Sequence, residues 1–119
     1  MSESPITSVE NRPGLVLIRV LPDSIDDEQV DGLRADVRAA AAAHPASPCV
    51  LDLSGVKFVP SLALAAFIRL HTELSARGQR LILAGLQRHV RDVFIKTRLD
   101  RTFELQDDVA AAARSIGVA

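Results

Sequence analysis

The sequence predicts an α/β fold with a mostly parallel sheet, and three observations support this. Short apolar runs alternate along the chain with longer segments of helical period. Alternation of this kind implies that helices connect neighbouring parallel strands. The chain has 119 residues, the length of one domain, and its 48% hydrophobic content is enough to build a core. We therefore expect a single domain over residues 12–119, preceded by residues 1–11 as either a flexible N-terminus or an edge strand.

The first strand is expected at residues 14–21. This stretch, GLVLIRVL, is short, apolar and β-branched, and it follows the turn-forming pair Pro13-Gly14. Residues 6–10, ITSVE, are expected to pair with it as a hairpin.

The first helix is expected after this strand. Three polar residues could cap its start: Asp23, Ser24 and Asp26. Asp27 and Glu28 follow, near the helix N-terminus, where the helix dipole favours negative charge. Apolar residues then recur on one helical face, at Val30, Leu33 and Val37. The alanine run 39–43 favours a helix, and Pro45 ends it.

The second half of the chain continues the alternation. Strands are expected at residues 49–56, 80–85 and 102–105, and helices at 61–77, at 87–97 and from Asp107 to about Ile116. The first two strands are apolar runs typical of strands covered on both faces. The inward face of the helix 61–77 is expected to hold Leu64, Phe67, Ile68, Leu70 and Leu74. Gly78 is placed to end this helix as a C-cap glycine.

Composition and charge argue against several kinds of partner. The net charge is −1 and no basic run exists, so nucleic acid and anionic membrane surfaces have no electrostatic support. The N-terminus lacks the basic and apolar regions of a signal peptide, and no apolar stretch approaches the roughly 20 residues of a membrane span. We therefore expect a cytoplasmic protein with no membrane insertion.

Metal and cofactor sites are not expected either. Cys49 is the single cysteine, and it builds no metal set with the scattered histidines His44, His71 and His89. It lies at the start of an apolar run, which predicts a small buried side chain. No cofactor-binding motif is present, so we expect no cofactor.

Residues 50–105 carry a series of short motifs in a fixed order. They are the turn Asp52-Leu53-Ser54-Gly55-Val56, Ser61 and Leu64 at a helix start, Ala76-Arg77-Gly78 at a helix end, and Val90-Arg91, Thr97, Leu99 and Phe103 in a last block. In this order and spacing the motifs resemble the STAS domain, the family of anti-sigma factor antagonists. The resemblance implies a four- to five-stranded mixed sheet with helices packed mainly on one face.

The resemblance also implies a function. Family members are bacterial transcription regulators that act in partner switching. The dephosphorylated domain binds a serine kinase that doubles as an anti-sigma factor, and so frees the sigma factor. Phosphorylation of the serine at the helix start breaks the contact, and a phosphatase restores it. The expected phosphorylation site here is Ser61, and the expected partners are a serine kinase/anti-sigma factor and a phosphatase.

Ser61 also has a physical role to fill. A serine between a loop and an amphipathic helix is expected to cap the helix, its hydroxyl accepting a backbone N–H. The same place suits a phosphate, which would add about −1.5 to −2 charge where free N–H groups converge. By helical spacing the outward surface of the helix start holds Ser61, Leu62, Ala65 and Arg69. We take this set as the candidate partner-binding surface.

The sequence departs from the family pattern at the switch. Pro60 stands where the family has aspartate before the serine, and Ala63 stands where it has glycine. Arg98 precedes Leu99 where glycine is frequent. Because Pro60 has no side-chain acceptor, it favours an alternative role: a non-phosphorylated STAS subunit of a lipid-transport ABC complex or of a stress-signalling scaffold.

Two further features leave alternatives open. Asp52 and Ser54 follow a strand at the edge where ligands of open α/β sheets gather, so they could line a small anion or nucleotide crevice or only form turn hydrogen bonds. The 87–101 region is basic whereas residues 23–31 are acidic, which is either a solvated surface or a means of steering a charged partner.

Catalysis is not expected. Ser61 and His71 are ten residues apart along one helix, a rise of about 15 Å, so they cannot form a catalytic triad. We therefore predict a binding protein and no enzyme.

Overall fold

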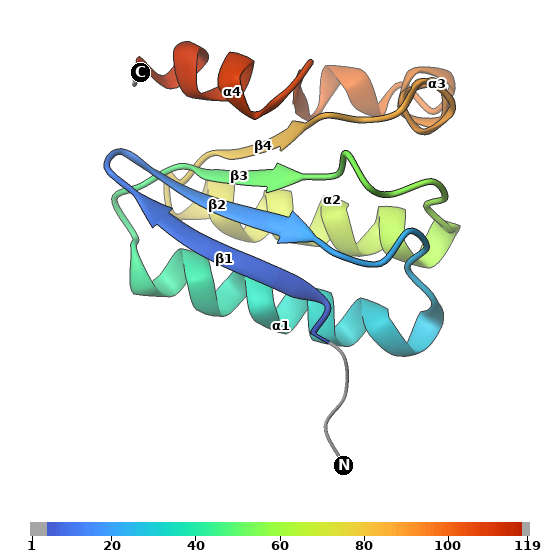
Figure 1. Ribbon diagram of the computed structural model, residues 1–119, viewed down its shortest axis with the longest axis horizontal. Coiled ribbons are helices and arrows are strands. Elements are labelled where there is room, and N and C mark those ends of the chain that lie inside the picture. The colour runs from blue at the N-terminus through green and yellow to red at the C-terminus, as the bar shows by residue number, and fades with distance from the viewer. Residues whose placement is uncertain (1–4, 118–119) are drawn as a thin grey trace.

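The computed structural model describes residues 5–117, which form a five-stranded mixed sheet and four α-helices (Figure 1). The strands are β1 Thr7–Arg12, β2 Leu15–Val20, β3 Cys49–Asp52, β4 Leu81–Ala84 and β5 Glu104–Gln106. The helices are α1 Asp27–Ala43, α2 Ser61–Ala76, α3 Arg88–Lys96 and α4 Val109–Ile116, with a short 3-10 turn at Leu99–Arg101. The predicted α/β fold class is confirmed.

The strands lie in the order in which they occur in the sequence. β1 and β2 form an antiparallel hairpin in which Thr7 faces Val20 and Arg12 faces Leu15. β2, β3, β4 and β5 pair in parallel, each reached through a helix. The predicted hairpin is confirmed, with β1 at the sheet edge. Residues 1–4 lie outside the described residues, so the proposed division at residue 11 stays a prediction.

Helices cover the two faces of the sheet unequally. Alternate strand residues belong to two separate apolar clusters, because side chains alternate across a strand. The larger cluster packs the sheet against α1, α2 and α3. On the other face only α4, among the described helices, packs against the strands, and it does so through Ala112 and Ala113. The helices therefore lie mainly on one face, as predicted, and β3 and β4 are buried throughout.

Helix α1 begins with a full capping box. Of the three candidates, Asp26 is the N-cap: its carboxylate accepts from the Gln29 backbone N–H at 2.9 Å, and the Gln29 side chain accepts from the Asp26 N–H at 3.0 Å. The first turn carries Asp27 and Glu28, as predicted. The helix ends at Ala43, directly before the cap residue His44.

A buried glutamine joins the end of α1 to the sheet. Gln79 is only 4% exposed, and its side-chain nitrogen donates to the carbonyls of Ala41, His44 and Ser47 at 3.1, 3.0 and 2.9 Å. One amide has two N–H bonds, so the three acceptors share them. Gln79 thereby fixes the loop between α1 and β3 against the residues that lead into β4.

Two sequence-based expectations need correction. The strand expected at 49–56 ends at Asp52, because the Asp52 carboxylate accepts from the Ser54 N–H at 3.0 Å and turns the chain. Ile68 was expected to face inward but is 38% exposed. The buried face of α2 is instead completed by the small residues Ala63 and Ala66.

Gly85 allows a close approach between two strand ends. It has φ +76°, and a Cβ added there would lie 3.0 Å from the Ser54 Cβ and 3.3 Å from Asp52 Oδ1. Gly78, after the end of α2, has a similar φ of +73° but open space around it. A side chain at position 78 would therefore meet backbone strain alone, whereas one at position 85 would meet both strain and steric crowding.

We expect Gly78→Ala to lower the free energy of unfolding by about 1 kcal/mol, for backbone strain alone. Gly85→Ala should cost about 2–3 kcal/mol, since overpacking adds to the strain. Urea unfolding followed by far-UV circular dichroism measures both. Equal losses in the two variants would show that Ser54 and Asp52 do not crowd position 85.

Candidate functional site

The candidate residues gather at one edge of the sheet. Parallel pairing aligns the carboxyl ends of β2, β3, β4 and β5, and the helices that follow these strands begin there. Figure 1 shows the arrowheads of β2 and β3 pointing to the side where α1 and α2 start. Asp52, Ser54, Ser61 and Leu62 lie at this edge, whereas Ala65 and Arg69 lie further along α2.

Ser61 is the first helical residue of α2 and not its N-cap. The cap is Pro60, which has extended dihedral angles (φ −71°, ψ 164°) and whose carbonyl accepts from the Leu64 N–H at 3.1 Å. The predicted capping role of Ser61 is therefore wrong: the ring of Pro60 suits the extended position, and the chain is already helical at Ser61. No side chain among the described residues caps α2, and its first turn holds no acidic residue.

The predicted contact surface is exposed in full. Ser61, Leu62, Ala65 and Arg69 are all exposed, and Leu62 keeps 48% of its accessible surface. A groove of about 150 Å³ runs between α1 and α2. Leu62, Ala65, Ala66 and Arg69 line it from α2, and Asp27, Val30, Asp31 and Arg34 line it from α1. Three of the four predicted residues therefore share one groove, directly after Ser61.

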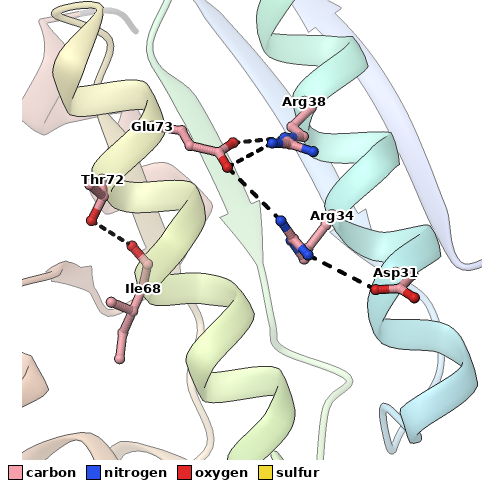
Figure 2. A network of polar contacts seen from close by, with 6 residues as sticks. All are labelled: Asp31, Arg34, Arg38, Ile68, Thr72 and Glu73. Carbon is pink, nitrogen blue, oxygen red and sulfur yellow. Dashed lines mark hydrogen bonds and ion pairs between the residues drawn. The ribbon is translucent and has the colours of Figure 1, made fainter.

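Ion pairs connect α1 and α2 next to this groove (Figure 2). The Glu73 carboxylate on α2 accepts from Arg38 Nε and Nη2 on α1 at 2.7 and 2.8 Å. Arg34 extends the network, 4.0 Å from both Glu73 and Asp31. The hydrogen bond from Arg38 lowers the pKa of Glu73, and the same contact raises the pKa of Arg38.

An open hollow lies on the other side of the α2 start. It has a volume of about 520 Å³ and is lined by Ser24, Ile25, Asp26, Asp27, Glu28, Phe58 and Pro60. Phe58 is 60% exposed, a large fraction for an aromatic side chain. Exposed apolar side chains, Phe58 and Leu62, therefore flank Ser61 in the sequence on both sides. Sequence reasoning did not select Phe58 or the lining residues of α1, because their proximity to Ser61 arises only when the loops and helices pack.

Asp52 and Ser54 form a tight turn at the end of β3. Asp52 Oδ1 accepts from the Ser54 N–H at 3.0 Å, and Oδ2 lies 3.5 Å from Arg19 Nε on β2. The Gln87 side chain donates to the Ser54 carbonyl at 3.1 Å. The turn hydrogen bonds are thus present, and the anion or nucleotide crevice stays a prediction.

Other reactive groups lie apart from this edge. Cys49 is buried, as predicted, and desolvation raises the pKa of its thiol to about 11. His71 packs edge-on against the Phe103 ring, with ring centroids 5.3 Å apart. Within residues 5–117, no three His, Cys, Asp or Glu side chains are grouped to hold a metal ion. No helix in the same part of the chain is long and apolar enough to cross a membrane.

Comparisons with a family model and with solved structures point to the same protein family. The model of the STAS domain matches residues 7–112. An anti-sigma factor antagonist from Mycobacterium paratuberculosis is 24% identical, with a TM-score of 0.81 over 92% of both chains. An anti-sigma factor antagonist (STAS) domain protein from Planctomyces limnophilus is 16% identical, with a TM-score of 0.81 over 93% of this chain and 97% of that one.

A third similar structure is the Bacillus cell fate determinant SpoIIAA in its phosphorylated form. It is 20% identical, with a TM-score of 0.69 over 92% of this chain and 98% of that one. At these identities the three structures show a shared fold. The five-stranded mixed sheet described above is that fold.

The Arg38–Glu73 contact predicts a specific pH dependence. Because the pKa of Glu73 lies below its ordinary value of 4.5 in the folded chain, its ionised form stabilises the fold above that value. This contribution is lost as pH falls through the lowered pKa. We expect Glu73→Gln to be less stable than wild type near neutral pH, and the difference to shrink from about pH 6 to about pH 3.

Thermal unfolding across this range measures the effect. Asp92→Asn is the matched control, since Asp92 is exposed in the middle of α3 and takes part in no ion pair among the described residues. A Glu73→Gln difference that stays constant with pH would contradict the assignment.

Proposed function

Because the chain belongs to the STAS domain family, we propose that it is a regulatory binding module, an anti-sigma factor antagonist that binds a serine kinase/anti-sigma factor without catalysing a reaction itself. The observation that carries this proposal is the exposed start of α2. Ser61 lies there at the first helical position, with Phe58 and Leu62 exposed on either side of it in the sequence. An apolar centre with a polar rim is typical of protein–protein interfaces.

The groove between α1 and α2 supports the same role. Its lining includes small side chains, Ala65 and Ala66, and charged side chains of both signs. A volume of about 150 Å³ suits a single side chain of a partner better than a metabolite, since small-molecule pockets are usually about 300–1,000 Å³. The Arg38–Glu73 pair links α1 and α2 beside the groove.

Phosphorylation of Ser61 would act directly on this surface. No side chain within residues 5–117 caps α2, so its first N–H groups and the positive end of its dipole can stabilise a phosphate. The phosphate would add about −1.5 to −2 charge beside exposed apolar side chains, where a partner would have to desolvate it. The solved phosphorylated form of the Bacillus relative supports a switch of this kind. A phosphatase would restore the binding form.

A second role is favoured by Pro60. It occupies the N-cap of α2 without a side-chain hydrogen bond, so no carboxylate at this position can orient the Ser61 hydroxyl for a kinase. A chain that is never phosphorylated would serve as a fixed STAS subunit of a lipid-transport ABC complex or of a stress-signalling scaffold. Ala63 does not bear on this choice, because it is fully buried and its methyl group faces the core.

The first experiment separates the two roles. Wild type, Ser61→Ala and Ser61→Asp are used to capture partners from a lysate of the native organism, and the captured protein is then purified and titrated calorimetrically. For a phosphoryl switch we expect a kinase-like partner that binds wild type and Ser61→Ala alike. Ser61→Asp should bind at least about tenfold more weakly, a loss of about 1.4 kcal/mol.

Ser75→Asp is the matched control. It places the same charge on an exposed residue of the same helix, in its last turn and away from the candidate surface. Equal binding by Ser61→Asp and wild type would exclude the switch and favour the fixed subunit. Weak binding by Ser75→Asp as well would mean that the charge acts through the fold and not through the surface.

A further inference from the structure

Arg98 has a backbone conformation that an arginine rarely adopts. With φ 62° and ψ 18° it is left-handed, and within residues 5–117 no other non-glycine residue has a positive φ. Glycine takes this conformation freely, whereas a side chain at this position is strained. Arg98 makes no ion pair among the described residues. The backbone of Arg98 is hydrogen-bonded to Ile95 and Arg101, but no ion pair in the described part of the chain holds its side chain, which leaves the guanidinium available for a use outside the fold.

Arg98 lies in a short exposed basic segment that also holds an apolar residue. We define the basic surface as Ile95, Lys96, Arg98 and Arg101, all of which are exposed. None of its three cations has a carboxylate within 4.0 Å among residues 5–117. Ile95 keeps 49% of its surface exposed. Asp92 and Asp100 are the two carboxylates in the same stretch, so the surface keeps an excess of positive charge.

A surface of opposite charge, which also holds one exposed apolar side chain, lies near the start of α1. We define it as Asp23, Asp27, Glu28, Asp31 and Phe58, again all exposed. The Asp23 carbonyl accepts from the N–H groups of Lys57 and Phe58, which places the exposed ring beside the acidic loop. Lys57 and Arg34 are neighbouring cations, but residues 23–31 hold five carboxylates and no basic residue. Each surface thus combines unbalanced charge with one exposed apolar side chain.

Within residues 5–117 no ion pair joins the two surfaces of one molecule. Figure 1 shows the start of α1 and helix α3 at opposite margins of the sheet. We propose that the acidic surface of one copy binds the basic surface of a second copy, head to tail. The charges are complementary, Phe58 and Ile95 supply apolar contact, and the chain's net charge of −1 opposes association only weakly.

The proposed contact between two copies would lie close to the start of α2. Phe58 and Asp27 line the hollow that also includes Pro60, directly before Ser61. A second copy bound there covers the neighbourhood of Ser61 and competes with any partner that uses Leu62. Self-association requires neither a kinase nor a phosphate, so this inference stands apart from the proposed function.

Sedimentation velocity tests the proposal directly. At about 0.02 M salt we expect the average mass of wild type to rise with protein concentration, and at about 0.5 M salt we expect a monomer, because salt screens surface charge. Arg98→Gly should raise the melting temperature by relieving strain, yet reduce the apparent association constant severalfold. If Arg98 had only a structural role, Arg98→Gly would change the melting temperature and leave the association constant unchanged.

Charge reversal identifies the surfaces. The variant Lys96→Glu with Arg101→Glu, and the variant Asp23→Lys with Asp31→Lys, should each be monomeric alone. Mixed in equal amounts they should associate again, because each supplies the charge that the other lacks. Circular dichroism first confirms that both fold, and the replaced side chains are exposed and leave the Asp26 capping box intact.

Two results would overturn the proposal. One is a wild-type monomer at low salt up to about 1 mM protein. If that monomer binds a hexaglutamate peptide at residues 95–101 by NMR, the basic surface is assigned to an acidic protein instead of a second copy. The other is association that survives both charge reversals.

Discussion

The complete burial of β3 and β4 is the constraint on which the rest of the structure depends. Both strands are four residues long and buried at every position, so the sheet must be covered on both faces. Parallel pairing then requires each connection to cross back over the sheet, and every helix that follows a parallel strand starts at the same edge. Ser61 lies at this edge because α2 is the crossover between the two buried strands.

Local patterns allowed much of this to be predicted, and packing explains what they missed. The alternation of apolar runs and helical periods predicts the elements, and helical spacing places Leu62, Ala65 and Arg69 on the exposed side of α2. The N-cap was misassigned because a serine before a helix is usually the cap, whereas here Pro60 takes the extended position. The α1 side of the groove depends on how two helices pack, which no local pattern in either helix encodes.

Charged residues fall into two groups with different roles. Arg38 with Glu73, and Arg80 with Glu104, connect separate elements through hydrogen bonds of 2.6–2.8 Å and are satisfied within the chain. The cations of the basic surface have no such partners in the part of the chain that the structure describes. Exposed ion pairs contribute little to stability, so the paired group mainly sets geometry and the unpaired group is available to other molecules.

The hydrogen bonds of the buried Gln79 side chain have a consequence for how this protein can change over evolution. It gathers three backbone carbonyls at the amino edge of the sheet, opposite the edge that carries Phe58, Ser61 and Leu62. Substitutions in the exposed loops therefore leave the polar anchor of the scaffold untouched. Duplicated copies of such a chain can diverge in partner specificity by altering a few surface side chains, while a single buried amide preserves the common architecture.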